Sequence, residues 1–373
     1  MHRRDGVPEA RPRPRSRGTP APGGVTSLTS LAVMRALVVA NPAATTTNRG
    51  VRDRVLTTLA GELQVEVAET THRGHGSELA RKACVEGADV VLALGGDGTV
   101  NEVVNGLLHD GPGEHVPPLA VVPGGSTNVF SRALGRAREP LAATREVLDS
   151  LRAGRTRRIS LGTASARGAT TAPARLPDPK LAQSAADAGA AAHPEWGEPR
   201  WFAFSAGLGF DADVIGRVEA HRARGVRSTG LLYVLEATGT FVFGRERRDP
   251  PMSIELAGEP AIDGLFLCLV SNVSPWTYLG ARAVNPTPDA SFDTGLDVFA
   301  LGRTGIARML QHVREVFAAR PDVRGEGVHR WHDQAELTLT ARRPQGWQLD
   351  GDHLGTATGL RVRSVPSALT VVA

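Results

Sequence analysis

Apolar strand-like runs alternate with helical patterns through the first part of the chain. The predicted elements are, in order, strand 35–40, helix 51–63, strand 65–70, helix 77–86, strand 89–94, helix 99–108, strand 119–122, a helix from residue 128 and helix 140–153. Strands separated by helices of about 10–15 residues are typical of βαβ units. This pattern predicts a three-layer α/β domain around a parallel sheet, which we place at residues 34–164.

The composition changes near residue 165. Residues 165–200 are rich in Ala, Pro, Gly, Asp and Ser without a sustained period, which predicts a flexible linker or insertion. Beyond it, strands are predicted at 201–209, 252–256, 264–272, 296–301, 336–341 and 368–372, with helices only at 229–242 and 304–318. Residues 201–373 therefore read as a β-rich, sandwich-like domain, whose last strand could return to the first domain.

The formal charge of +4 comes from the start of the chain. Residues 1–33 hold six arginines against two acids, so the remainder is formally neutral. We expect a disordered Arg/Pro-rich leader, with Met34 as an alternative start, and no nucleic-acid partner. No apolar run reaches the roughly 18 residues of a membrane span. Two isolated cysteines, Cys84 and Cys268, favour a reducing, cytoplasmic location.

A glycine cluster follows the third predicted strand. The strand leads into Gly95, Gly96, Asp97 and Gly98, and a helix begins at once near Thr99. Glycines let backbone N–H groups approach a phosphate, and a helix N-terminus adds positive potential. An ordinary strand–turn–helix corner needs fewer glycines, so this segment predicts a phosphate-binding loop.

The next strand ends in a similar way. Leu119–Val122 is followed by the sequence PGGSTNVF, in which Gly125, Ser126 and Asn128 stand after the strand. In open α/β sheets, ligands bind beyond the carboxyl ends of the strands. The two loops together predict a phosphate-sized site. A Walker A loop, a protein-kinase signature and a dinucleotide-binding Gly-x-Gly-x-x-Gly are all missing.

These motifs resemble those of the diacylglycerol kinase catalytic domain, in the bacterial lipid kinase branch related to sphingosine kinases and more distantly to NAD kinases. The resemblance rests on GGDGTVNEVVNG, PGGSTNVFSRALG, the NP after the first strand, GLGFDADV, NPTPDASFDTGLDVFAL and QLDGD. It covers residues 35–373 apart from the linker. It implies an ATP- and Mg²⁺-dependent kinase that acts on a lipid hydroxyl.

The resemblance also implies site residues. The ATP-binding positions would be Asn41, Pro42, Thr45, Thr70, Gly95, Gly96, Asp97, Gly98, Thr99, Asn101, Glu102, Gly125, Ser126 and Asn128. Asp350 falls where the family keeps its general base, and Asp352 replaces the usual Glu of the same motif. Phosphoryl transfer to an alcohol needs a carboxylate to accept the proton and Mg²⁺ to screen charge.

Several positions depart from the family. Thr45 and Thr46 replace a Gly and a Lys, Val129 replaces an Asp, and Ser160 replaces another Asp. At the accessory metal loop, Asp293 remains as a candidate ligand, but Thr294 drops the second carboxylate that a hard cation prefers. The lysine and its two carboxylates are lost together, so no buried charge is left unpaired.

Further residues point to lipid. Asp213 could contact a lipid head, by resemblance to sphingosine kinases, or be a solvated loop acid. Basic residues flank an apolar helix between Arg217 and Arg248, which suits either docking on anionic headgroups or packing in the core. We expect peripheral association with the membrane surface that holds the substrate, and a homodimer is an additional expectation.

The sequence therefore predicts an ATP-dependent kinase that converts diacylglycerol into phosphatidic acid, a step of phospholipid biosynthesis. Sphingoid base, another lipid alcohol or NAD are alternative acceptors. A non-catalytic nucleotide- or lipid-binding homologue is the alternative from another class, because of the substitutions at Val129, Ser160 and Thr294.

Overall fold

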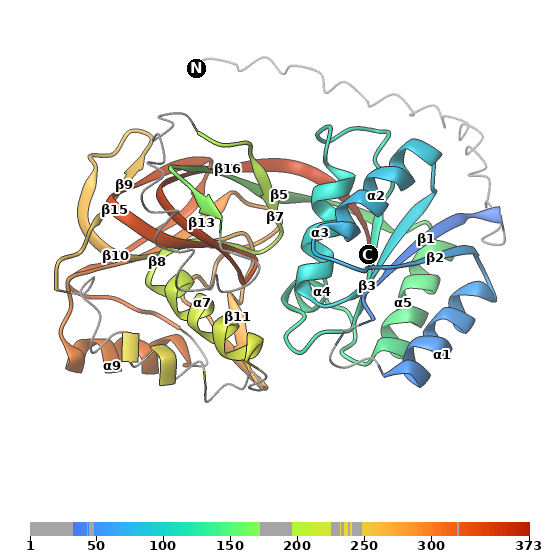
Figure 1. Cartoon of the computed structure of the whole chain (residues 1–373), viewed down its shortest axis with the longest axis horizontal. Helices are drawn as coiled ribbons and strands as arrows, with labels where there is room; N and C mark the ends of the chain where they lie inside the picture. The colour runs from blue at the N-terminus through green and yellow to red at the C-terminus, as the bar shows by residue number, and fades with distance from the viewer. Residues whose placement is uncertain are drawn as a thin grey trace, which may run out of the picture.

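A computed structural model describes residues 33–42, 44, 48–171, 196–224, 232, 235–237, 239–240, 248–318 and 321–373. The predicted leader, apart from Val33, and most of the predicted linker 165–200 lie outside the described residues. Figure 1 shows two regions side by side, an α/β region built from the first third of the chain and a β-rich region built from the remainder. This arrangement confirms the predicted fold class.

The α/β region follows the predicted order closely. Its elements are β1 (Arg35–Ala40), α1 (Arg49–Ala60), β2 (Gln64–Glu69), α2 (His75–Glu86), β3 (Val90–Gly95), α3 (Asp97–Leu107), β4 (Leu119–Pro123), α4 (Val129–Ala133) and α5 (Pro140–Arg152). The four strands are parallel, in the order β4-β3-β1-β2. All residues of β3 and β4 are buried, as expected for parallel strands covered by helices on both faces.

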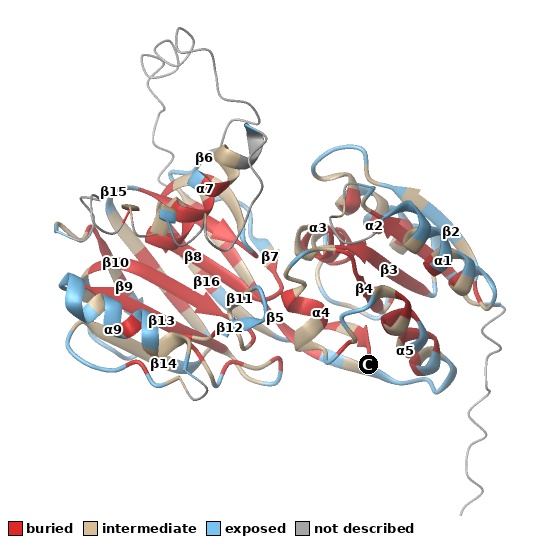
Figure 2. Cartoon of the chain, turned by 90° about the horizontal axis from the view of Figure 1, so that it is seen from below, coloured by how far each residue is buried: buried red, intermediate tan, exposed pale blue. Residues whose placement is uncertain are grey.

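The β-rich region contains the remaining strands of the described part of the chain. They are β5 (Thr156–Arg167), β6 (Thr170–Thr171), β7 (Arg200–Phe202), β8 (Ser205–Gly209), β9 (Met252–Leu256), β10 (Ile262–Ser271), β11 (Thr277–Leu279), β12 (Arg282–Val284), β13 (Leu296–Gly302), β14 (Val328–Gln334), β15 (Glu336–Leu349) and β16 (Asp352–Val372). The helices α7 (Phe210–Ala223) and α9 (Ile306–Val316) accompany them in the described part of the chain. Figure 2 shows β8 and most of β10 as buried, whereas much of α9 is exposed.

One long strand joins the two regions. β16 pairs with β15 at its start, with β5 along its second half, and in parallel with β4 through Val371 and Leu119. Fourteen strands therefore form one hydrogen-bonded sheet, and β16 crosses from one region to the other in Figure 1. The last strand returns to the first domain in this structure.

Three sequence predictions need correction in the second half. The expected strand 201–209 is broken into β7 and β8 by Ala203 and Phe204, whose N–H groups bind a side chain instead of a strand. Helix α7 was not predicted, although it follows β8 directly. β15 and β16 are also far longer than the predicted strands at 336–341 and 368–372. Much of the predicted helix 229–242 lies outside the described residues.

Candidate active site

The two glycine loops meet at the carboxyl ends of β3 and β4. The Gly124 N–H donates to the Gly95 carbonyl over 2.7 Å. A Cβ atom on Gly125 would lie 2.6 Å from the Gly96 Cα, which is closer than two carbon atoms in contact can be. The two backbones can therefore touch here only because Gly125 has no side chain. The glycines therefore serve the packing of one loop on the other, and they leave backbone N–H groups of both loops at one edge of the sheet.

Asp97 fastens the first loop to the second. Its carboxylate accepts hydrogen bonds from the N–H groups of Val129 (3.0 Å) and Phe130 (3.2 Å), at the start of α4. Burial raises the pKa of Asp97 to about 6, although both N–H groups act in the opposite direction. At Val129, where the family often has an acid, the backbone N–H makes the contact. Asp97 thus turns toward α4, which its position in the sequence does not reveal.

Asn128 braces the second loop from within. It has a φ of 50°, and its side chain both accepts from the Gly125 N–H (2.8 Å) and donates to the Gly125 carbonyl (2.6 Å). Asn tolerates this left-handed conformation better than most residues. Ser126, in the same loop, is exposed.

The first turn of the sheet borders the same loops. The Asn41 N–H donates to the Leu94 carbonyl (3.1 Å), and its side-chain amide lies 3.4 Å from the buried Thr99 hydroxyl. Thr70 binds the end of β1 through its N–H, 2.9 Å from the Ala40 carbonyl. Pro42 is exposed, and Thr45 lies outside the described residues. Asn41 and Thr99 are therefore placed together by the fold.

Glu102 has a different environment from the other predicted ATP-binding residues. Its carboxylate accepts from the N–H groups of Gly74 (2.8 Å) and Gly76 (2.9 Å), at the N-terminus of α2. A carboxylate at this end of a helix satisfies unpaired N–H groups and complements the helix dipole. Glu102 therefore ties α3 to α2.

Asp350 lies at the junction of the two regions. It occupies the tight turn between β15 and β16 with a φ of 49°, and only 5% of its surface is exposed. Its Oδ1 accepts from the N–H groups of Phe204 (2.8 Å) and Ser205 (3.0 Å). Its Oδ2 accepts from the Ala203 N–H (2.7 Å) and the Asn101 side-chain amide (2.7 Å). The carboxylate thus has four donors, one of them from the helix that begins at the glycine loop.

Burial and hydrogen bonding act on Asp350 in opposite directions. Burial disfavours the charge and is the larger effect, while the three backbone donors and Asn101 favour the charge. The balance raises the pKa of Asp350 to about 6. The group is therefore ionised at neutral pH and has a proton affinity suited to a general base.

Asp352 stands at the mouth of the same site. Its carboxylate lies 3.1 Å from the Arg73 guanidinium, and a Cβ atom on Gly98 would lie 3.8 Å from it. Both partners are well exposed, so the pair can exchange partners with a ligand. Arg73 precedes α2 and, through Asp352, brings a positive charge close to Gly98 of the glycine loop. The sequence reasoning missed Arg73 because nothing local marks it.

Asp213 and Asp293 lie outside this arrangement. Asp213 belongs to α7, and a Cβ atom on Gly346 of β15 would lie 2.3 Å from its Oδ1. Asp293 forms an exposed ion pair with Arg157, at 2.6 Å. Within the described part of the chain, no group of three His, Cys, Asp or Glu side chains is placed to hold a metal ion.

Several supporting residues were also missed by the sequence reasoning. Asn105 donates to the Trp201 carbonyl (2.9 Å) and accepts from its N–H (2.9 Å), which fixes β7 against α3. Gln348 accepts from the Gly351 N–H (3.0 Å) and donates to the buried Asp211 (3.1 Å). The available signal was the spacing of Asn101 and Asn105, four residues apart on one side of a predicted helix.

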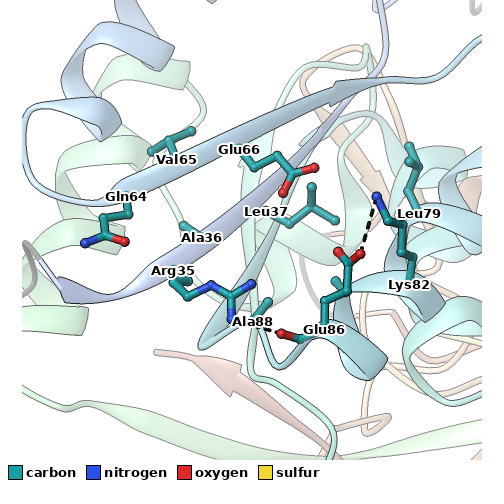
Figure 3. A pocket seen from close by; sticks show the side chains of 11 residues that line it. Arg35, Ala36, Leu37, Gln64, Val65, Glu66, Leu79, Lys82, Glu86 and Ala88 are labelled. Carbon is teal, nitrogen blue, oxygen red and sulfur yellow. Dashed lines mark hydrogen bonds and ion pairs between the residues drawn. The ribbon is translucent and has the colours of Figure 1, made fainter.

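A separate hollow of about 290 Å³ lies between β1, β2 and α2 (Figure 3). Three of its charged residues bind one another, since Arg35 donates to the Glu86 carbonyl (2.9 Å) and Lys82 pairs with the Glu86 carboxylate (3.6 Å). None of the predicted site residues lines it. We therefore assign the candidate site to the glycine loops and the Asp350 turn.

The protein thus combines an α/β domain, which has two glycine loops, with a β-rich region, which carries the buried Asp350 carboxylate. One sheet runs through both. Residues 35–164 match the family model described as diacylglycerol kinase catalytic domain. The resemblance inferred from the motifs is thereby confirmed for this segment.

Three similar proteins are all named as kinases. The chain is 42% identical over 93 residues to a diacylglycerol kinase of Bacillus subtilis, which is 25% of this chain and 29% of the relative. It is 42% identical over 97 residues, 26% of this chain and 30% of the relative, to a probable lipid kinase YegS-like of Chromohalobacter salexigens. It is 39% identical over 93 residues, 24% of this chain and 12% of the relative, to sphingoid long-chain bases kinase 1 of Arabidopsis thaliana. The matches thus span less than a third of each relative.

The fold extends over more of the chain than these matches do. A crystal structure of a diacylglycerol kinase from Bacillus anthracis aligns with a TM-score of 0.63 and 19% identity, and covers 91% of this chain and 96% of that one. This likeness shows a shared fold for both regions. No helix in the described segments is long and apolar enough to cross a bilayer.

Proposed function

We propose that the chain is an ATP-dependent lipid kinase that transfers the γ-phosphoryl group to a lipid hydroxyl, with diacylglycerol as the acceptor and phosphatidic acid as the product. One observation carries the proposal. The buried carboxylate of Asp350 is bonded to Asn101, on the helix whose N-terminus forms the glycine loop. A nucleotide at the loops and a base at the turn would thus be held by one rigid element.

The proposed step moves one proton and one phosphoryl group. The lipid hydroxyl gives its proton to Asp350, its oxygen bonds to the γ-phosphorus, and the bond to the β–γ bridging oxygen breaks to release ADP. Asp350 has to release one of its four donors before it can accept the proton. Asn101 is the donor that can turn away, because the other three are backbone N–H groups.

Positive charge for the triphosphate would come from two sources. The N–H groups at the start of α3 and in the second loop favour an anion. Arg73 would leave Asp352 to bind phosphate, in place of the missing lysine. We infer that magnesium enters as the ATP complex, with Asp97 and Asp352 nearby, because Mg²⁺ often binds one or two carboxylates together with substrate phosphates. Asp293 is not part of this arrangement, because it is paired with Arg157.

The acceptor is tested with purified protein, radiolabelled ATP and Mg²⁺. Diacylglycerol in mixed micelles, a sphingoid base and NAD are offered separately, since one of the relatives is named as a sphingoid base kinase. We expect labelled phosphatidic acid from the first mixture. Asp350→Asn should abolish transfer while its turn survives, because Asn tolerates a positive φ. Asp53→Asn, on the exposed side of α1, is the matched control.

The outcomes separate the alternatives. Transfer only to the sphingoid base or to NAD would replace the acceptor and keep the enzyme class. ATP binding without transfer to any acceptor would overturn the kinase proposal in favour of a binding protein. Full activity of Asp350→Asn would remove Asp350 from the mechanism.

A further inference from the structure

Helix α9 (Ile306–Val316) has an apolar face that the fold does not cover. Ile306, Leu310 and Val313, called here the α9 stripe, are 49%, 66% and 43% exposed. The spacing of four and three residues places them along one side of the helix. Met309, His312 and Val316 already anchor the helix to the protein. The stripe is therefore not needed to hold α9 in place.

The stripe concentrates exposed apolar side chains on one helix. Three of the seven large apolar side chains that are exposed in the described part of the chain lie on α9. Single exposed apolar residues are normal, but a group of them usually marks an interaction site.

The charges around the stripe are basic. Arg303 precedes the helix, and Arg314 follows Leu310 by four residues, so it borders the stripe. Both are exposed, and neither forms an ion pair with another described residue. The only acid on α9 is Glu315, whose carboxylate is bonded to Gln311 (2.7 Å) and His312 (3.2 Å). An apolar stripe with basic neighbours complements an anionic lipid surface.

The position of α9 relates the stripe to the candidate active site. Met309 and Val316 pack against the same cluster as Phe210 and Val214, at the start of α7. Figure 1 shows both helices on the same side of the β-rich region. The first turn of α7 also carries Asp211, which is bonded to Gln348 beside the catalytic turn. A surface that contacts α9 would therefore lie on the side of the sheet where α7 approaches the Asp350 turn.

We propose that α9 docks on an anionic lipid surface, with Ile306, Leu310 and Val313 in the headgroup boundary and Arg314 among the phosphates. The inference deepens the proposed function, because the acceptor lipid resides in such a surface. Docking would hold the enzyme where its substrate is concentrated and leave the chemistry of Asp350 unchanged.

Co-sedimentation with vesicles tests the proposal. The full chain is mixed with vesicles of phosphatidylcholine and phosphatidylglycerol in equal parts, or of phosphatidylcholine alone. We expect binding to the anionic vesicles that weakens with salt. The double variant Leu310→Gln/Val313→Gln should bind at least about tenfold more weakly, because two exposed apolar side chains no longer enter the boundary. Arg314→Gln should weaken binding about fivefold.

Matched controls lie on the other region. Val85→Gln removes an apolar side chain that is 84% exposed, and Arg145→Gln removes an exposed arginine of α5. Neither should change vesicle binding. With a short-chain acceptor dissolved as monomers, the double variant should keep wild-type turnover, and only its turnover on vesicles should fall.

Wild-type binding by the double variant, or equal weakening by Val85→Gln, would overturn the proposal. So would a loss of self-association, seen by light scattering, with vesicle binding unchanged, since the stripe would then contact a second copy. The docking of α9 and the proposed kinase activity can fail independently. Vesicle binding that depends on the stripe, without phosphorylation of any acceptor, would retain docking and reject the kinase.

Discussion

Gly125→Ala is the sharpest test of the contact between the two glycine loops. The new Cβ would lie 2.6 Å from the Gly96 Cα and 3.0 Å from the Asn128 Oδ1. Carbon atoms in contact are ordinarily about 3.5–4.0 Å apart. The nearest obstacle is backbone, so no flexible side chain can move aside, and the loops have to separate by about 1 Å.

This separation should lower the free energy of unfolding. The Gly124 N–H to Gly95 carbonyl bond, now 2.7 Å, would open beyond hydrogen-bond range. Overpacking costs about 1–3 kcal/mol, and a lost hydrogen bond adds about 0.5–1.5 kcal/mol. We expect a decrease of about 2–4 kcal/mol in the free energy of unfolding, together with weaker ATP binding because the N–H groups of the two loops no longer converge.

Urea denaturation gives the stability, and isothermal titration calorimetry with Mg·ATP gives the affinity. Gly50→Ala is the control, because its Cβ would meet nothing closer than 3.6 Å on α1, and it should stabilise the helix slightly. If Gly125→Ala unfolds at the wild-type urea concentration, the loops are not in contact. If it is destabilised but binds ATP normally, the loops pack together without forming the nucleotide site.

Three further predictions concern charged groups. Because burial raises the pKa of Asp350 to about 6, kcat/KM should fall as the pH decreases below about 6, and a profile flat down to pH 5 would contradict its role as base. Burial also raises the pKa of Asp211 to about 7, so the folded state binds its proton more tightly than the unfolded state, and stability should fall as pH rises from about 4 to about 7. Asp211→Asn should make this slope shallower in denaturation experiments, and the remaining slope should come in part from Asp97 and Asp350, whose pKa values are also raised. Arg73→Ala should raise the KM for ATP roughly tenfold with kcat nearly unchanged. Arg73→Lys should restore part of the affinity for ATP. An unchanged KM in Arg73→Ala would exclude phosphate binding by Arg73.

The sequence predicted what depends on local pattern. β1 was placed with its exact bounds, because a short apolar run between turn residues has few alternatives. The ends of β3 and β4 were located because glycines mark them. The meeting of both loops at one sheet edge followed from parallel strands, whose carboxyl ends share an edge.

The sequence could not predict contacts that long-range pairing creates. Asp350 takes three donors from residues 203–205, which approach only because β8 pairs with β15. Asp97 reaches α4 across 32 positions of sequence. α7 was missed because its first turn, with Asp211 and Asp213, resembles a polar loop, and its apolar residues follow no clear helical stripe.

The arrangement of the site depends on one helix more than on any loop. Asp97, Asn101 and Asn105 are four residues apart, so they line one side of α3. Asp97 binds the start of α4, Asn101 binds the Asp350 carboxylate, and Asn105 binds β7. A helix is stiff over two turns, so the distance from the glycine loops to the base is set by α3 itself and not by the connections between the regions. Substitutions that shift α3 should therefore disturb nucleotide binding and the pKa of Asp350 together, whereas changes in the connection between β6 and β7 should affect neither.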